Sequence, residues 1–215
     1  MRRVWSKQQG IAIRVETVVV LSRPQNLEYN FKKALTWSKI TSGIFSARYC
    51  GGHYLFDDAA AICHNENTNI LYFVLGLLNS PISQFILNIL NPTINIQISD
   101  IAKLPVILPE ENTQFSTFSF QLSTVNSLVE KNISLSKSDW DSFETSWDFT
   151  KHPLLPTVDF KDAAANSIRI SDMYSKWEGE CSERFAILKS NEEELNRIFI
   201  ENLWLAGRTY SRSFG

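Results

Sequence analysis

The 215-residue sequence has few cysteines, few glycines and no long uninterrupted apolar run. Its three cysteines are an odd number at irregular spacing, which indicates free thiols in a reducing compartment and not a disulfide framework. The most apolar segment, residues 70–90, contains asparagine, serine and glutamine, so it predicts a core helix and not a membrane span. The N-terminus has basic and polar residues without an apolar stretch, so we expect no secretory signal. These absences favour a cytoplasmic protein that does not enter a membrane.

Motifs for catalysis and metal binding are also lacking. The glycine pair Gly51 and Gly52 is too short for a phosphate-binding loop. Four potential zinc ligands between residues 50 and 64 match no usual spacing of a zinc site. Asn91, Pro92 and Thr93 resemble half of the Asn-Pro-Pro-aromatic loop of amino-methyltransferases, but the second proline and the aromatic residue are missing. We therefore expect no catalytic residue, no metal site and no cofactor site in this chain.

The composition that remains is that of a globular protein, with 44% hydrophobic, 20% charged and 12% aromatic residues. The length allows one compact core plus an appended element. Charge is unevenly distributed, because residues 1–56 carry a net charge of +7 and residues 57–215 a net charge of −9. A basic first quarter favours a polyanionic partner that is contacted at one end of the chain. The alternative is an ordinary solvated face.

Residues 70–109 organise the predicted fold. Apolar residues at helical spacing predict one helix that ends near Asn79 and a second that begins at Ser80 or Pro81. Asn91 precedes a proline and so ends the second helix. Isoleucines at positions 94, 96 and 98 then alternate with polar residues, which predicts a strand. One face of this strand is buried, and the other carries the amides of Asn95 and Gln97.

The basic first quarter predicts mostly strands. A β-branched run at residues 11–21 predicts one or two strands, and residues 27–35 predict a short helix. Residues 36–49 and 53–56, joined by a turn at Gly51 and Gly52, predict a hairpin. Residues 57–69 form a loop or include a short strand at residues 59–63. The hairpin mixes aromatic, basic and hydroxyl side chains, which is the mixture that contacts bases and phosphates.

The acidic remainder predicts helices. Residues 110–132 predict an amphipathic helix, and residues 136–141 predict the start of another, in which Trp140, Phe143 and Trp147 pack together. Residues 162–205 are helical in pattern, and Asn191 followed by three glutamates resembles a helix N-cap. A pair of antiparallel helices is therefore expected at the C-terminal end.

Several stretches of the sequence together match one family. They are residues 22–26, 36–43, 75–80, 91–97, 101–105, 136–155 and 191–200. In combination they resemble the target-recognition region and C-terminal helices of adenine-specific DNA methyltransferases of the phage-exclusion (BREX) type, the PglX-like proteins. Relatives of that family include restriction–modification enzymes with a TaqI-like specificity domain. Residues 1–21 and 202–215 depart from the family pattern.

The resemblance implies a fragment of a larger enzyme. Full-length relatives are several times longer, and their S-adenosylmethionine site and Asn-Pro-Pro-aromatic loop lie upstream of the matched region. The chain would thus keep the domain that reads the DNA sequence and lack the catalytic domain, so we expect it to be inactive alone. Its expected partners are double-stranded DNA and the missing methyltransferase domain or other subunits of the defence system.

The sequence thus predicts an α+β fold with two parts. Residues 1–109 would form a small mixed β target-recognition domain with a packed helix pair, and residues 110–215 an antiparallel helical region. The resemblance and the hairpin composition together assign DNA contacts to Arg23, Trp37, Ser38, Lys39, Arg48, Tyr49, Asn95 and Gln97. The alternative functions are a helical protein-interaction module and a non-functional gene remnant.

Overall fold

The computed structural model describes residues 4–5, 12–13, 27–57, 59–107, 116–155 and 169–212. They fall into two compact units, residues 1–30 and 31–215. In the first unit, β1 (Val4–Trp5) pairs antiparallel with β2 (Ala12–Ile13), and η1 (Leu27–Tyr29) is a single 3-10 turn. The strands predicted at residues 11–21 lie mostly outside the described residues, and so does Arg23.

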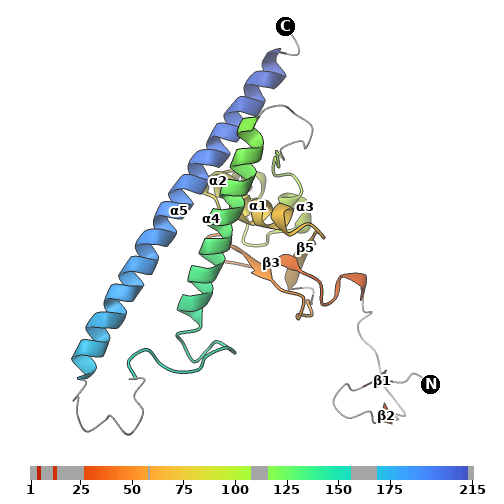
Figure 1. Cartoon of the computed structure of the whole chain (residues 1–215). Helices are drawn as coiled ribbons and strands as arrows, with labels where there is room; N and C mark the ends of the chain where they lie inside the picture. Colours follow the sequence, from red (N-terminus) through yellow and green to blue (C-terminus); the bar gives the residue numbers. More distant parts are fainter. Residues whose placement is uncertain are drawn as a thin grey trace. The chain divides into compact units, whose positions relative to one another are not determined.

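The second unit contains a three-stranded antiparallel sheet in the order β4-β3-β5, of which β3 and β5 are labelled in Figure 1. Its strands are β3 (Ala34–Ser38), β4 (Ala47–Cys50) and β5 (Ala60–His64). Leu35 and Trp37 of the central strand are buried and point toward the helices, because alternate residues of a strand share a face. With the helices described below, this sheet confirms the predicted α+β class.

The predicted hairpin is wrong in its strands and its connection, because residues 36–49, expected to form one strand, contain β3, a loop and β4. Residues 39–46, and not the two glycines, join β3 to β4, and residues 53–56 are not in a strand. A Cβ on Gly52 would lie 2.5 Å from the carbonyl oxygen of Phe31, so this glycine permits a close backbone approach. The second partner of β3 is β5, which matches the short strand considered at residues 59–63.

The short helix predicted at residues 27–35 is wrong beyond its first turn. Phe31 has a φ of 60°, a left-handed conformation that ends the 3-10 turn, and β3 begins at Ala34.

Two consecutive helices, α1 (Thr68–Leu78) and α2 (Pro81–Leu90), confirm the predicted pair. The side chain of Asn67 accepts a hydrogen bond from the backbone of Asn69 and caps α1, and Ser80 caps α2 in the same way. Within the described ranges, no single helix has the length and apolar character to cross a membrane. Only α1 and α2 taken together pass such a test, and a bend of 70° separates them.

The strand predicted around Ile94, Ile96 and Ile98 is wrong. The described residues there form one isolated bridge, between Ile40 and Asn95, followed by the short helix α3 (Ile98–Ile101). The carboxylate of Asp100 accepts a hydrogen bond from the backbone N–H of Gln97 at 3.0 Å, which starts a helical turn. A local side-chain bond of this kind competes with strand pairing.

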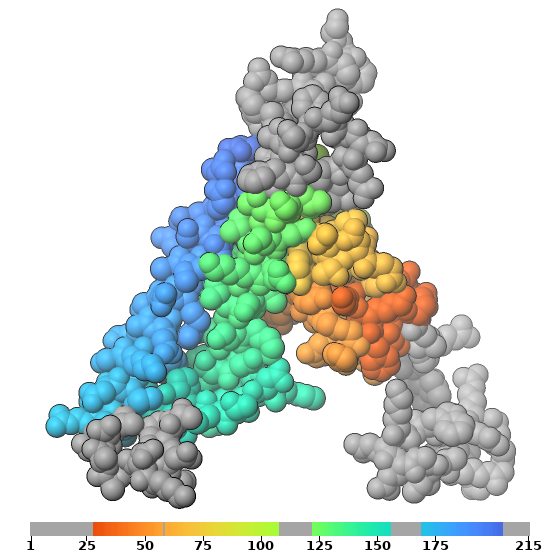
Figure 2. All heavy atoms as spheres, viewed as in Figure 1, coloured from red at the N-terminus to blue at the C-terminus, as the bar shows by residue number. Residues whose placement is uncertain are grey.

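Two long helices, α4 (Ser116–Trp140) and α5 (Ile170–Arg212), lie side by side (Figures 1 and 2). Asn132 of α4 bonds to Asn191 of α5, and Asp139 of α4 bonds to Arg184 of α5. A later residue of α4 thus contacts an earlier residue of α5, so the two helices run antiparallel, as predicted. Asn191 lies within α5 and is not an N-cap, because its amide is used between the helices.

Residues 136–141 end α4 and do not begin a new helix, so this prediction is wrong. Lys137 bonds to both Asp141 and Asp148, and these ion pairs hold the turns that follow α4. The predicted packing of Trp140, Phe143 and Trp147 is also wrong, because all three are exposed. Phe143 instead meets Trp177 of α5 edge to face, with ring centroids 6.4 Å apart.

Helix α1 lies in the core between the sheet and the long helices. Tyr72 on one side meets Tyr49 of β4, and Phe73 meets Phe199 of α5, each with ring centroids 5.4 Å apart. A Cβ on Gly76 would lie 2.9 Å from Cγ2 of Val129, so α1 and α4 approach closely. The sheet and the helical region therefore share one core. The division of the chain at residues 109 and 110 stays a prediction.

Candidate nucleic-acid interface

The sheet face that points away from α1 carries two of the predicted DNA-contacting residues. Arg48 lies opposite Thr36 in the β3–β4 register, and Ser38 is two residues further along β3. Both Ser38 and Arg48 are exposed. Lys39 follows directly and is partly exposed, and its backbone N–H donates to the carbonyl of Ala59 at 3.0 Å. This bond fixes the backbone at Lys39, and the pairing of β3 with β4 fixes the backbone at Arg48, the other member of this basic pair.

The two predicted aromatic contacts lie on the helix-facing side of the sheet. Trp37 is 3% exposed and packs against Phe45, so its ring is not available for stacking on a base. Its indole N–H has no hydrogen-bond partner among the described residues. Tyr49 is partly buried against Tyr72, and burial raises the pKa of both phenols above the usual 10. These rings hold the strands on α1.

Residues 91–97 form a loop that is fastened to the end of β3. The backbone N–H of Thr41 donates to the carbonyl of Ile94 at 2.9 Å, and that of Ile96 donates to the carbonyl of Lys39 at 2.8 Å. Ile96 is bonded directly to the backbone of Lys39, and Gln97 is the next residue along the loop. The structure thus brings predicted residues of the two segments together through a bridge and not through the predicted strand.

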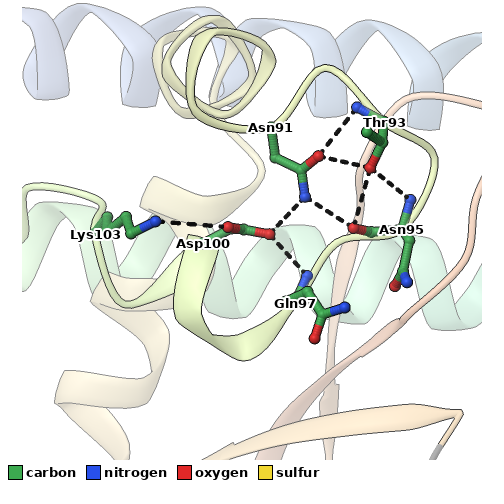
Figure 3. A network of polar contacts seen from close by, with 6 residues as sticks. All are labelled: Asn91, Thr93, Asn95, Gln97, Asp100 and Lys103. Atoms are coloured by element: carbon green, nitrogen blue, oxygen red, sulfur yellow. Dashed lines mark hydrogen bonds and ion pairs between the residues drawn. The ribbon is translucent and has the colours of Figure 1, made fainter.

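A polar network inside the loop centres on Asp100, which is 7% exposed (Figure 3). One carboxylate oxygen of Asp100 accepts from Nδ2 of Asn91 at 2.6 Å and from the backbone N–H of Gln97 at 3.0 Å. These hydrogen bonds, the one from Asn91 first, lower the pKa of Asp100 below its usual 3.8. Asn91 also donates to the carbonyl of Asn95 at 2.8 Å and accepts from Thr93. Asp100 is therefore ionised at neutral pH.

The two predicted amide side chains of the loop have different surroundings. Oδ1 of Asn95 is buried and has no hydrogen-bond partner within the described part of the chain. Gln97 is exposed and is the N-cap of α3, where its side chain and the backbone of Asp100 form one half of a capping box. The loop therefore exposes the side chain of Gln97 at the start of α3 and uses the main-chain carbonyl of Asn95 for its own structure.

Asp100 is the residue of this surface that the sequence-based prediction missed. The signal was present, because an acidic residue three positions after Gln97 is the spacing at which a side chain accepts from the backbone of a helix N-cap. The alternating isoleucines favoured a strand and concealed it.

A second polar group lies at the other end of β3. Glu66 accepts from Nζ of Lys32 and meets Nε2 of His64, each at 3.2 Å. These bonds, the one from His64 first, lower the pKa of Glu66 below its usual value. Lys32 is thereby paired with an acid, so its contribution to the basic surface is reduced.

The potential zinc ligands do not gather. In the described ranges no group of three or more histidine, cysteine, aspartate or glutamate side chains could hold a metal ion. Cys50 and Cys63 stand on β4 and β5, on opposite sides of β3, and are free thiols. Burial raises the pKa of both, so neither is an activated thiolate.

Comparison with known proteins gives two relatives. The chain is 36% identical over 199 residues to the adenine-specific methyltransferase PglX of Lacticaseibacillus casei (strain Zhang), and this alignment covers 91% of the chain. It is 31% identical over 133 residues, or 61% of the chain, to the adenine-specific methyltransferase BrxX of Escherichia coli O9:H4 (strain HS). The chain is homologous to part of these adenine-specific methyltransferases. No family model matches the chain.

The homologous part makes up only a small share of the length of each relative. The chain spans 15% of the length of PglX and 10% of the length of BrxX. It is therefore consistent with a fragment of such an adenine-specific methyltransferase, as the sequence motifs predicted.

Proposed function

We propose that this chain is the DNA-binding portion of an adenine-specific methyltransferase of a phage-defence system, separate from the catalytic portion. The observation that carries the proposal is the homology to PglX, which extends over nearly the whole chain and only 15% of the relative. A segment of this length is the size of one or two typical domains, and the unmatched remainder of the relative is large enough to hold the methyl-transfer domain. The methyl donor S-adenosylmethionine would bind in the part of the relatives that this chain does not match.

The surface formed by Ser38, Lys39, Arg48 and Gln97 supports DNA as the partner. Arg48 on β4 and Lys39, directly after β3, would neutralise phosphates, which supply most of the affinity of a DNA-binding protein. The hydroxyl of Ser38 and the amide of Gln97 can donate to and accept from phosphates or base edges. In a complete enzyme, this surface would hold the duplex while the target adenine is rotated out for methyl transfer.

The test is a binding titration of the 215-residue chain with a fluorescent DNA duplex at several salt concentrations. Binding should weaken steeply as salt rises, and Lys39→Glu or Arg48→Glu should each lower the slope of log K against log salt by about one. Lys131→Glu, a reversal at an exposed lysine of α4, is the matched control and should leave the slope unchanged. Binding of the Lys39→Glu, Arg48→Glu double variant with the affinity and slope of the wild type would overturn the proposal.

A second candidate function is a protein-interaction module, and the exposed aromatic residues of the helical region favour it. Trp147 is fully exposed, and Trp140, Tyr174 and Phe185 are each at least half exposed. Exposed aromatic residues are enriched at protein interfaces. If the chain binds no duplex but binds the catalytic polypeptide of the same system, and Trp147→Ser and Phe185→Ser abolish this binding, the interaction function would replace DNA recognition.

A further inference from the structure

We propose that the loop of residues 91–97 is the base-reading element of the DNA surface. In this proposal Gln97 is the specificity-determining residue and Asp100 is the residue that positions it. The inference rests on the proposed DNA-binding function and adds a division of labour. Lys39 and Arg48 would supply affinity for any duplex, whereas the loop would supply preference for particular base pairs, since phosphate contacts carry no sequence information.

The loop is held in one conformation by a small number of strong bonds (Figure 3). The buried carboxylate of Asp100 joins the beginning of the loop to its end, because the same oxygen accepts from Asn91 and from the backbone of Gln97. The side chain of Asn91 also donates to the carbonyl of Asn95 and so holds the middle of the loop. Hydrogen bonds to an ionised group are about twice as strong as neutral ones. A reading element needs this rigidity, because loosely held contacts discriminate poorly.

The exposed groups of the loop match the major-groove edge of an A·T pair. A glutamine amide can donate to N7 and accept from N6 of adenine, and apolar side chains contact the methyl group of thymine. Gln97 supplies the amide. Three isoleucines beside it are unusually exposed, Ile40 at 65% and Ile94 and Ile98 at 61% each. Ile40 belongs to the segment that bridges to the loop, so apolar and amide groups stand close together.

The two bonds to one oxygen of Asp100 give a test of the positioning role. Asp100→Asn keeps an oxygen that can accept both bonds, whereas Asp100→Ala removes the acceptor. If Asp100 acts by holding the loop, Asp100→Asn should retain most of the sequence preference and Asp100→Ala should lose it. In the Asp100→Ala variant, the amide protons of Gln97 and of the rest of the loop should also exchange faster with solvent.

The experiment selects bound molecules from a library of duplexes with a randomised centre and sequences them, for the wild-type chain and each variant. Gln97→Ala should reduce the preference at one or two A·T positions by roughly 5- to 150-fold. Its salt slope should stay that of the wild type, because an uncharged amide neutralises no phosphate. Asn69→Ala, which removes an exposed amide on α1, is the matched control and should keep the full preference.

The outcomes separate this inference from the proposed function. Absence of any duplex binding by the wild-type chain would overturn both. Binding by the wild type without any sequence preference, or a Gln97→Ala variant that selects the same sequences with the same strength, would overturn the reading role alone. Equal preference in Asp100→Ala and Asp100→Asn would overturn the positioning role, and the Gln97 result does not depend on whether Asp100→Ala folds.

Discussion

Substitution of Gly76 tests the packing of α1 against the long helices. Glycine within a helix costs about 1 kcal/mol relative to alanine, so Gly76→Ala should stabilise α1 if the site had room. The added Cβ would, however, lie 2.9 Å from Cγ2 of Val129 and 3.4 Å from the ring of Phe199. Overpacking of a core costs about 1–3 kcal/mol. The net result should be a loss of about 1 kcal/mol in the free energy of unfolding, or about 2–4 °C in Tm.

Gly179 is the matched control for this substitution. It lies in α5, and no atom is within 4 Å of the position of its added Cβ. Gly179→Ala should therefore gain roughly 0.5–1 kcal/mol from helix propensity alone. The two variants should differ by about 2 kcal/mol in urea denaturation monitored by circular dichroism.

A double-mutant cycle with Val129 identifies the cause of the loss. Val129→Ala removes the methyl group that the new Cβ meets, so it should cost at least 0.5 kcal/mol less in the Gly76→Ala background than in the wild type. If Gly76→Ala stabilised the protein as much as Gly179→Ala, or if the cycle showed no coupling, the close approach of α1 and α4 would be refuted.

Three further predictions concern polar groups, and each is measured by urea denaturation. Asn191→Leu leaves the amide of Asn132 unpaired and should cost about 1–3 kcal/mol, whereas the double change to leucine should cost less than the single one. Because the folded-state pKa of Asp100 is lowered, its stabilisation is present above pH 3.8 and lost as the pH falls through the folded value, so Asp100→Asn should be less sensitive to acid than the wild type. Ser80→Ala removes the cap of α2 and should cost about 1 kcal/mol; unchanged stability would show that the cap is dispensable.

The sequence correctly predicted the helices whose formation depends on interactions between residues close together in the chain. The helix pair at residues 70–90 followed from apolar spacing, from Ser80 as a cap and from Pro81, which a helix accepts in its first turn. The helical character of α5 followed from the helical pattern of residues 162–205, and the antiparallel arrangement with α4 is shown by the contact between Asn132 and Asn191. In these segments propensity, capping and burial agree.

Predictions failed where a distant residue or a single side chain decides. The partners of β3 depend on contacts between segments far apart in sequence, so the sequence offered a short strand at residues 59–63 only as an alternative to a loop and did not give its partner. The strand predicted around Ile96 failed because one carboxylate, that of Asp100, captures the N–H of Gln97. Asn191 has the spacing of a cap, but its partner Asn132 is 59 residues away.

The candidate DNA surface could be predicted only in part. Arg48 and Gln97 are exposed and Lys39 is partly exposed, as a binding role requires. Composition could not show that Trp37 points toward the helices, since this depends on which face of β3 the helix α1 covers. An aromatic residue of a strand can stack on a base only if its side chain lies on the face that the helices do not cover.

The most direct test of the central claim is hydrogen–deuterium exchange of the 215-residue chain with and without a DNA duplex. We predict that DNA slows exchange in residues 38–48 and 94–99, which carry the basic pair and the loop, and leaves residues 176–193 of α5 unchanged. Slower exchange confined to α5, with none at residues 38–48 and 94–99, would contradict the account.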